Sequence, residues 1–510
     1  MSQKLFDNEY GFSVSENNPF FIFPYLQKKA HELFPESQIL DLSRGDPGLG
    51  FAPAEKSRKF YSFLVAVDTY LNSNISHFRM HLQSEDDAEK VDDIILNASR
   101  EVFSTKQSEE HMKTLDEVVK KIQGFAKEEG EEISRFKILK EIFKFSTLCG
   151  GSYHTPWGEP LVKLVVAGMY RKLLDDQEIH SDNLLFTLGV NDAIGTLFKM
   201  LDGIGYLKKG DTVAASTPAY APYFNEMNTR EYDVVEIAMD PRTGDLDLEE
   251  LEKNTKKIKV FFLITPNNPA GVKYGTDQLK KIAEIAEKND ALIITDEIYA
   301  QFFKDFDTIW KYAKKRTLRL CGRSKIERSP GIRFGDVLIS NETQDYLSHV
   351  LLKDYINAPD FKTQLVWSKA PGGNFGSFQH TASVPGPSQI LGMLHILLGE
   401  EEQKQYVEMV DKNMDEFFRI LEIPRNNKMY YGVFNLNDIP NTTKKEESID
   451  KKMYELCTKY GVILIPAMKF FSEKSQKADD KSNYVRVSLP NLSFTQVSEA
   501  AKRIKKYLTE

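Results

Sequence analysis

The 510-residue chain has little of what marks a secreted, membrane-spanning or nucleic-acid-binding protein. Its three cysteines, at positions 149, 321 and 457, are too widely separated to indicate a disulfide framework or a zinc site. No apolar run approaches the about 18 residues of a membrane span, and the N-terminus lacks a signal-peptide pattern. The net charge of -8, without a basic block, disfavours nucleic acid and anionic membranes as partners. We therefore expect a cytoplasmic protein without a bound metal.

A long helical segment follows the N-terminal part of the chain. Between residues 57 and 150 helix-forming residues dominate, and apolar side chains such as Phe60, Phe63 and Leu64 recur at helical spacing. Polar stretches such as SEDDAEK (84–90) separate these patterns. Apolar stripes of this kind are more often packing surfaces than ligand sites. We therefore predict an all-helical insertion with a modest core of its own.

After this segment, strand-like and helical patterns alternate. KVFFLIT (259–265) and ALIIT (291–295) are almost wholly apolar, as are strands buried on both faces of a parallel sheet. An amphipathic pattern at 276–290 lies between them and completes a βαβ unit. This part of the sequence therefore predicts an α/β fold with a mainly parallel sheet. The C-terminal patterns predict a smaller α+β lobe, with one long helix at 390–422, strands at 430–437, 461–468 and 483–490, and a final helix.

Polar residues follow three of the predicted strands where each strand ends. Asn268, Asp296 and Lys325 each come after such a run. Taken singly they have ordinary explanations, as a turn residue, a helix N-cap and a surface charge. A buried lysine, however, can form a Schiff base with a carbonyl cofactor. Because parallel α/β sheets bind ligands beyond the carboxyl ends of their strands, three such residues in consecutive positions indicate a common site.

The motifs around these residues resemble those of pyridoxal-phosphate-dependent aminotransferases of the aspartate aminotransferase fold type. NNPAG (267–271), TDEIY (295–299) and SK, followed after four residues by PGIRFG (330–335), have the family's order and about its spacing. The resemblance extends from Arg44 to Arg486 apart from the helical insertion. It implies fold type I, pyridoxal 5'-phosphate as cofactor, and amino acid and 2-oxo acid substrates. It also implies a homodimer or larger homo-oligomer.

The same resemblance suggests where the domains begin and end. We expect residues 1–56 to form the N-terminal part of the small domain and residues 57–150 to form the helical insertion. Residues 151–390 would form the cofactor-binding large domain, and residues 391–510 the C-terminal part of the small domain.

The resemblance also assigns roles around the cofactor ring. Lys325 would bind the cofactor as a Schiff base and then act as general acid and base. Asp296 would keep the pyridine nitrogen protonated. Asn268 and Tyr299 would hydrogen-bond the phenolic oxygen, and Tyr220 would stack on the ring, although outside the family context Tyr220 is an ordinary core tyrosine.

Further residues would bind the cofactor phosphate and the substrate. Val190 and Asn191, which open a helix after a strand, would offer backbone N–H groups to the phosphate. Arg333 would add a bidentate charge, and Tyr153 would reach the phosphate in a neighbouring subunit. Arg486, on a predicted C-terminal strand, would bind the substrate α-carboxylate.

Some segments are similar to those of the aspartate 4-decarboxylases, a subgroup that also transaminates aspartate and carries a comparable insertion. They include SRGDPG (43–48) and CGGSYHTPWGEPLVK (149–163). By this resemblance Arg44 and Gly45 would contact the substrate, although Arg44 can equally be a structural turn residue. The lysine's surroundings depart from the family: Gly322 replaces a usual serine, Glu327 and Arg328 replace small or aromatic residues, and Ala270 replaces a common threonine.

Three functions are therefore open. The first is amino-group transfer from an acidic amino acid, chiefly L-aspartate, to a 2-oxo acid. The second is 4-decarboxylation of aspartate to L-alanine and CO2. The third is a non-catalytic pyridoxal-phosphate-binding module, which is disfavoured because no basic helix-turn-helix segment precedes residue 150. The presence of Lys325, Asp296 and Arg486 also argues against this third function.

Overall fold

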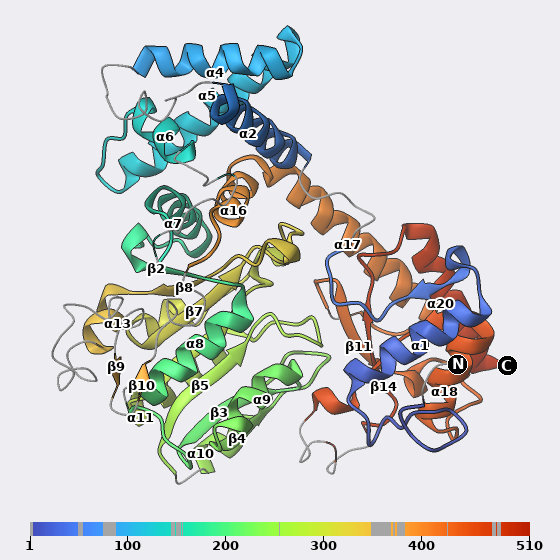
Figure 1. Cartoon of the computed structure of the whole chain (residues 1–510). Coiled ribbons are helices and arrows are strands. Elements are labelled where there is room, and N and C mark those ends of the chain that lie inside the picture. Colours follow the sequence, from blue (N-terminus) through green and yellow to red (C-terminus); the bar gives the residue numbers. More distant parts are fainter. Residues whose placement is uncertain are drawn as a thin grey trace. The chain divides into compact units, whose positions relative to one another are not determined.

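The chain, whose helices and strands are labelled in Figure 1, divides into two compact units, which we call unit 1 and unit 2. Unit 1 comprises Met1–Phe51, Lys208–Ala313 and Gln405–Glu510, and unit 2 comprises Ala52–Leu207 and Lys314–Lys404. The domain boundaries expected from the sequence stay a prediction. The computed structural model describes residues 4–48, 55–74, 88–143, 148, 155, 157–203, 205–253, 256–347, 369–370, 373–374, 383–425, 427–471, 476 and 481–510.

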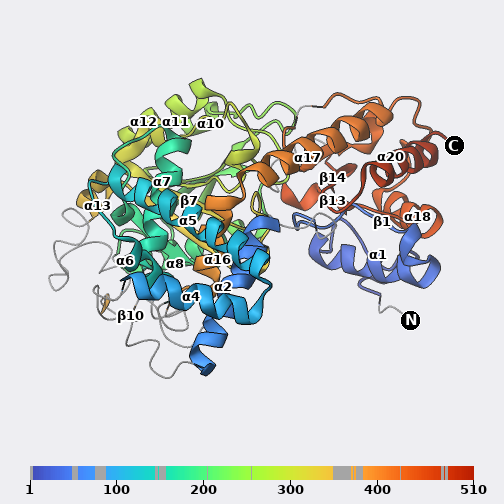
Figure 2. The ribbon, with the colours of Figure 1, turned by 90° about the horizontal axis from the view of Figure 1, so that it is seen from above.

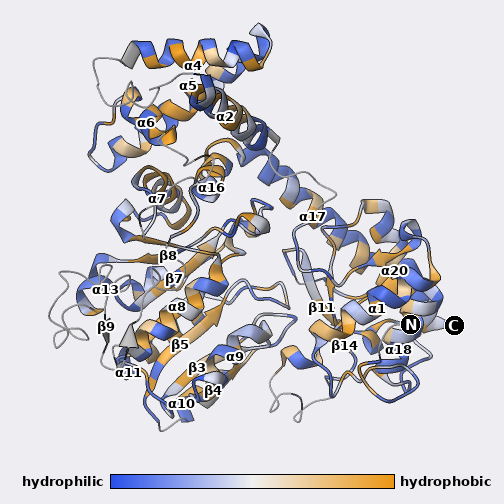
Figure 3. Cartoon of the chain, viewed as in Figure 1, coloured by the Kyte–Doolittle hydropathy of each residue, from blue (hydrophilic) through white to orange (hydrophobic). Residues whose placement is uncertain are grey.

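Four parallel strands in unit 1 confirm the predicted α/β sheet. They lie in the order β6-β5-β3-β4. Side chains of these strands and of the amphipathic helix α11 form a buried core. The ribbons of β3 and β5 carry hydrophobic colour in Figure 3. The bounds are β3 (Thr212–Thr217), β4 (Asp233–Ala238), β5 (Ile258–Ile264), β6 (Leu292–Asp296), α9 (Ala221–Thr229), α10 (Glu249–Lys253), α11 (Thr276–Asn289) and α12 (Trp310–Ala313).

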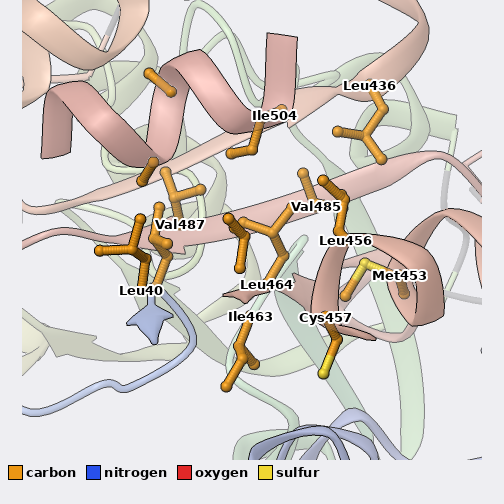
Figure 4. Close-up of a cluster of buried hydrophobic side chains, with 14 of the residues drawn as sticks. Leu40, Leu436, Met453, Leu456, Cys457, Ile463, Leu464, Val485, Val487 and Ile504 are labelled. Carbon is orange, nitrogen blue, oxygen red and sulfur yellow. The ribbon is translucent and has the colours of Figure 1, made fainter. Parts of the chain in front are cut away.

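The remaining elements of unit 1 come from both ends of the chain and form the predicted smaller α+β lobe. Helix α1 packs against α18, and α18 packs against α20 (Figure 2). The bounds are α1 (Pro19–Leu33), β1 (Leu40–Asp41), β11 (Tyr431–Asn435), α18 (Ile449–Tyr460), β12 (Val462–Ile463), β13 (Ile465–Pro466), β14 (Tyr484–Ser488) and α20 (Phe494–Thr509). Side chains from these elements other than β13 contribute to one apolar core, shown in Figure 4.

Two C-terminal elements differ from the sequence prediction. The single strand expected at 461–468 is divided, because β12 pairs with β1 whereas β13 pairs with β14 in an antiparallel sheet ordered β11-β14-β13. The single helix expected at 390–422 is two helices, α16 (Gly386–Leu398) and α17 (Glu400–Leu421). Gly399 ends the first, and three glutamates then open the second, where negative charge suits the helix N-terminus.

Unit 2 contains the predicted helical segment, a set of antiparallel strands in the order β2-β8-β7, and the antiparallel pair β9 and β10. Helix α2 packs on α16 and α4, and α5 packs on α7. The bounds are α2 (Glu55–Asn74), α4 (Ala88–Val102), α5 (Thr105–Glu128), α6 (Arg135–Ile142), α7 (Pro160–Leu174), β2 (Leu184–Thr187), α8 (Val190–Gly203), β7 (Thr317–Gly322), β8 (Gly335–Ile339), α13 (Asn341–Tyr346), β9 (Lys369–Ala370) and β10 (Gly373–Asn374). None of the described helices combines the length and apolar composition that a membrane crossing needs.

The core in Figure 4 generates a stability prediction. Leu464 is 1% exposed within it, so Leu464→Ala should lower the free energy of unfolding by about 2–5 kcal/mol through lost burial and a residual cavity. Urea denaturation followed by circular dichroism measures this loss. The control Leu33→Ala removes the same atoms from a side chain in a residue that is 55% exposed, and should change stability by at most about 0.5 kcal/mol. Equal effects of the two substitutions would contradict the placement of this core.

Candidate active site

Asp296 is a fully buried carboxylate at the end of β6. Tyr223 Oη donates a hydrogen bond to Asp296 Oδ2 at 2.5 Å, and the Ile298 backbone N–H donates to Oδ1 at 3.1 Å. Burial and the neighbouring Asp296 carboxylate raise the pKa of Tyr223 well above its usual value, so this phenol stays protonated and keeps donating. Two donors of this kind favour the ionised form of Asp296.

Arg486, on β14, is a buried cation whose hydrogen-bonding capacity is not fully used. Its Nη2 donates to Ser43 O at 2.8 Å, and its Nη1 lies 3.5 Å from Asn268 Oδ1. The guanidinium lies over the rings of Tyr431 and Phe470, at 4.6 and 5.5 Å from their centroids. Arg486 is 2% exposed, yet its Nε has no hydrogen-bond partner among the described residues. A buried guanidinium with an unused donor is suited to bind a carboxylate.

Gly45 lies close to Tyr431, next to this guanidinium. Tyr431 Oη donates to Gly45 O at 2.8 Å, and a Cβ at position 45 would lie 2.8 Å from Tyr431 Oη and 3.9 Å from Arg486 Nη2. A side chain here would clash with the Tyr431 hydroxyl, whereas its distance to the guanidinium is an ordinary contact. Glycine is therefore required by the approach of Tyr431, and the contact of Gly45 with a substrate stays a prediction. The neighbouring Arg44 is exposed and its Nε donates to Asp41 Oδ2 at 3.1 Å. The structure thus pairs Arg44 within the chain, and its contact with a substrate stays a prediction.

The tyrosines expected near the cofactor ring belong to aromatic clusters of unit 1. Tyr299 is buried, with its ring edge-on to Tyr430 and Tyr431 at centroid distances of 6.1 and 5.8 Å. Burial, followed by the influence of Tyr431, raises the pKa of Tyr299 well above its usual value, so its hydroxyl remains a possible proton donor. Tyr220, just before α9, lies edge-on to Tyr223 at 5.3 Å.

In unit 2 the expected phosphate-binding residues gather at the start of α8. The helix begins at Val190, directly after Gly189, and Arg333 Nη2 donates to Leu188 O at 3.1 Å. Gly189 has a φ of +83°, and a Cβ there would lie 2.6 Å from Arg333 Nη2, so the turn requires glycine. Val190 is buried, whereas Asn191 is exposed. A helix N-terminus beside a guanidinium is suited to bind a phosphate.

Lys325 is partly buried and lies in a turn that buried ion pairs stabilise. Arg323 Nη1 is 2.8 Å from Glu327 Oε1, and Arg323 Nη2 is 3.1 Å from Asp336 Oδ2 of β8. Tyr170 of α7 donates to the other Asp336 oxygen at 2.6 Å. Burial raises the pKa of Glu327, and the Arg323 guanidinium opposes this effect. Because the pair of Arg323 and Glu327 spans Lys325, it constrains the backbone that carries the lysine.

Some contacts near Asp296 and Lys325 could have been inferred from the sequence, and others could not. Tyr223 was missed, although it follows Tyr220 by three residues and can therefore share its helical face. The ion pair of Arg323 and Glu327 has the four-residue spacing of opposite charges, a detectable signal that was interpreted only as a departure from the family. Gly322 has a local reason, because a Cβ there would lie 3.0 Å from Phe334 O. Tyr153 lies outside the described residues.

Asp296, Lys325 and the residues at the start of α8 suit the chemical groups of pyridoxal phosphate. The buried Asp296 carboxylate suits a protonated pyridine nitrogen, and the start of α8 with Arg333 suits a phosphate. The amine of Lys325 suits an aldehyde. Asp296 belongs to unit 1, whereas Lys325 and Arg333 belong to unit 2.

Comparisons with known proteins give a consistent result. A sequence model of the family "Aminotransferase class I and II" matches residues 170–504. A bifunctional aspartate aminotransferase and L-aspartate beta-decarboxylase from Pseudomonas sp. is 23% identical over 372 residues, which are 65% of this chain and 68% of that protein. An aspartate aminotransferase from Pyrococcus horikoshii is 26% identical over 388 residues, 73% of this chain and 87% of that protein.

The fold of this chain is also similar to that of a solved structure. YbdL from Escherichia coli, described as having a methionine aminotransferase function, superposes with a TM-score of 0.64. The alignment covers 98% of this chain and all of that chain at 14% identity. The named amino acids differ among these proteins, so the comparisons agree on the fold and the reaction class rather than on the substrate.

The hydrogen bond to Asp296 predicts a charge-dependent loss of stability. Tyr223→Phe should lower the free energy of unfolding at pH 7 by about 1.5–3 kcal/mol, because the acceptor is a carboxylate. Tyr274→Phe is the matched control: Tyr274 is equally buried but donates to the neutral Ser216 Oγ at 2.7 Å, and its loss should be about 1 kcal/mol. Urea denaturation measures both. Equal losses would mean that Asp296 does not act as an ionised acceptor.

The buried ion pair next to Lys325 predicts a larger and pH-dependent effect. Arg323→Met leaves the Glu327 and Asp336 carboxylates uncompensated and should lower stability by about 3–5 kcal/mol. Because a carboxyl with a higher pKa in the folded than in the unfolded state loses stability as pH rises, the deficit should be greater at pH 8 than at pH 5.

Chemical denaturation at both pH values checks this expectation. The double variant Arg323→Met with Glu327→Gln should recover part of the lost stability, since it removes one of the buried carboxylates. Lys404→Met, which removes one partner of an exposed pair with Glu400, should leave stability unchanged within error. A deficit that does not vary with pH would contradict the expected rise in the pKa of the uncompensated carboxyl groups.

Proposed function

Because the chain belongs to the class I and II aminotransferases, which use pyridoxal phosphate, we propose that it transfers the amino group of an acidic amino acid to a 2-oxo acid. We propose L-aspartate as the chief amino donor. The observation that supports an amino acid as substrate is the buried Arg486 guanidinium, whose Nε has no hydrogen-bond partner among the described residues. An isolated buried cation is costly unless an anion compensates it, and a planar guanidinium can bind a carboxylate with two parallel hydrogen bonds. The substrate α-carboxylate would supply this anion.

The roles proposed for the other residues follow from their chemistry. The bound cofactor supplies the carbonyl that takes up the amino group and the electron sink that stabilises negative charge at the substrate Cα. The Lys325 amine would bind the cofactor and move the Cα proton. The ionised Asp296 would hold a proton on the pyridine nitrogen, while Asn268 and Tyr299 would hydrogen-bond the phenolic oxygen.

The remaining proposed roles concern the cofactor ring, its phosphate and the assembly. Tyr220 would stack on the ring. Val190, Asn191 and Arg333 would bind the phosphate through backbone N–H groups and a guanidinium. Tyr153 would reach the phosphate held by a second subunit, which makes the proposed enzyme a homodimer.

The preference for an acidic side chain is supported by the environment of Gly45 and by two relatives. Gly45 adjoins Arg486, since a Cβ at position 45 would lie 3.9 Å from Arg486 Nη2. Arg44 is a neighbouring cation that would bind a second carboxylate after breaking its ion pair with Asp41. Both of the relatives compared above are named for aspartate.

A second candidate activity is release of the aspartate 4-carboxylate as CO2, leaving L-alanine. The match to a bifunctional relative over 65% of this chain favours this candidate. Both reactions begin by removing the Cα proton, so the residues discussed here support either one. They differ in whether a bond to the substrate's distal carboxylate breaks afterwards.

The substrate proposal predicts a defined set of products. Protein loaded with pyridoxal phosphate and given L-aspartate should release oxaloacetate in the presence of 2-oxoglutarate as acceptor. Alanine and CO2 formed without an acceptor would instead support decarboxylation. A protein that binds the cofactor but forms neither set of products would overturn the assignment of aspartate.

Arg486→Lys tests carboxylate recognition within the same assay. It should lower kcat/KM by about 30- to 1,000-fold, since losing a bidentate contact to a buried charge costs about 2–4 kcal/mol. The control Arg419→Lys makes the same change at an exposed pair with Glu416 and should leave kcat/KM unaltered. If Arg486→Lys retains full activity, this arginine is not the carboxylate-binding residue.

A further inference from the structure

Three buried polar side chains connect the helical segment to the turn that carries Lys325. Ser57 Oγ, on α2, lies 2.7 Å from His395 Nδ1 on α16. The opposite nitrogen, His395 Nε2, lies 2.8 Å from Ser329 Oγ, four residues after Lys325. Ser57 and His395 are fully buried and Ser329 is 2% exposed. We call these three residues the Ser57–His395–Ser329 chain.

The protonation state of the histidine makes this chain directional. Burial, together with the charges of Arg58, Arg328 and Arg323, lowers the pKa of His395 to about 3. The imidazole is therefore neutral at working pH, with one N–H donor and one acceptor nitrogen. Its two neighbours must then play opposite roles.

The hydrogen bonds of Ser329 settle those roles. Ser329 Oγ donates its single proton to Glu327 O at 3.1 Å, so it accepts from His395 Nε2–H. His395 Nδ1 is then the acceptor, and Ser57 Oγ is its donor. The contact from α2 therefore fixes the imidazole tautomer that holds Ser329.

Ser329, at one end of the Ser57–His395–Ser329 chain, adjoins a strained part of the turn. Arg328 is a non-glycine residue with a φ of +52°, a conformation that persists where the surroundings hold it in place. Its backbone N–H donates to Lys325 O at 3.1 Å, and the next N–H, that of Ser329, donates to Arg323 O at 3.3 Å. Ser329 thus anchors the backbone on the C-terminal side of Lys325.

We propose that helix α2 positions Lys325 through the Ser57–His395–Ser329 chain, so that the helical segment helps to set the geometry of the lysine. The inference rests on the proposed function insofar as Lys325 is the residue that binds the cofactor. The three residues are positioning residues, since none of them is placed in contact with the cofactor or substrate. Their effect should therefore appear in the backbone and reactivity of the turn rather than in substrate affinity.

Ser57→Ala tests this role, and Ser108→Ala is its matched control. Ser108, on α5, is also a fully buried serine of the helical segment, but its Oγ has no hydrogen-bond partner within the described part of the chain. Both substitutions remove one buried hydroxyl, and only one of them breaks the chain to Ser329. Ser329→Ala and the double variant Ser57→Ala with Ser329→Ala complete the set.

The first measurement uses protein without cofactor. Hydrogen exchange of a peptide covering residues 323–334 should be about tenfold faster in Ser57→Ala than in the unmodified protein, because the turn opens more readily. The second uses the loaded enzyme. Borohydride reduction should fix the cofactor on Lys325, and the pH midpoint of the visible absorbance of the lysine-bound cofactor should shift by about half a unit.

Kinetics separate positioning from binding. Ser57→Ala should lower kcat about tenfold, because a displaced catalytic group loses its alignment, with KM changed less than about twofold. The double variant should be no worse than Ser329→Ala, since both changes interrupt one chain. Ser108→Ala should match the unmodified protein in exchange, absorbance midpoint and kcat.

Several results would overturn the proposal. One is a Ser57→Ala protein with an altered melting temperature but unchanged exchange of residues 323–334, absorbance midpoint and kcat, which would make the chain merely structural. Another is full additivity of the two single substitutions. If reduction labels a lysine other than Lys325 in the unmodified protein, the lysine assignment falls and this inference with it. If reduction labels Lys325 but the Ser57→Ala protein is unaffected in exchange, absorbance midpoint and kcat, this inference is wrong while the proposed function still stands.

Discussion

The turn around Lys325 depends on the burial of one positive charge. Arg323 is almost wholly removed from solvent, and it is tolerated there because Glu327, Asp336 and the Tyr170 hydroxyl lie within hydrogen-bonding distance. Removing any of these partners would leave an uncompensated group in a region of low dielectric constant. The pair therefore fixes the path of the chain on both sides of Lys325, and it joins that path to β8 and α7. The rigid backbone fixes the position of the Lys325 Cα, from which the flexible side chain extends.

The second buried arginine, Arg486, shows the opposite balance. Its charge lies over aromatic rings and near a backbone and an amide oxygen, without an ion-pair partner among the described residues. Arg323 is thus compensated by the protein itself, whereas Arg486 keeps capacity for an external anion. This difference distinguishes a cation that the protein itself compensates from one suited to bind an anion more clearly than burial or sequence context does. Both residues are similarly hidden from solvent.

The extent to which the sequence predicted this molecule follows from the range of the forces involved. The strands β5 and β6 and helix α11 were predictable, because apolar runs and helical periodicity are local properties. The division of 461–468 into β12 and β13 was not, because it depends on pairing with β1 and β14, which are distant in sequence. Gly399 could have signalled the break between α16 and α17, but the apolar periodicity on both sides obscured it.

The same distinction applies to the candidate site. Asn268, Asp296 and Lys325 could be proposed as site residues because strand ends and family motifs are visible in the sequence. The bond from Tyr223 to Asp296 joins residues 73 positions apart, and its chemical importance becomes apparent only once both are seen to be buried. Glu327 is a departure from the family for a related reason, since a buried carboxylate two residues from Lys325 is explained only when its guanidinium partner is known.

The helical segment is attached by polar groups as well as by apolar stripes. Arg171 of α7 is buried, and it contacts Glu128 at 3.1 Å and Glu129 at 2.8 Å. Ser57 contacts His395 at 2.7 Å in a fully buried position. An apolar interface tolerates small shifts in register, whereas a buried hydrogen bond loses most of its value when its partners move apart. Polar attachments therefore specify a single placement of α2 and α5 within unit 2. A segment required only to cover an apolar surface would not need that precision, but a segment that sets the position of a reactive lysine would.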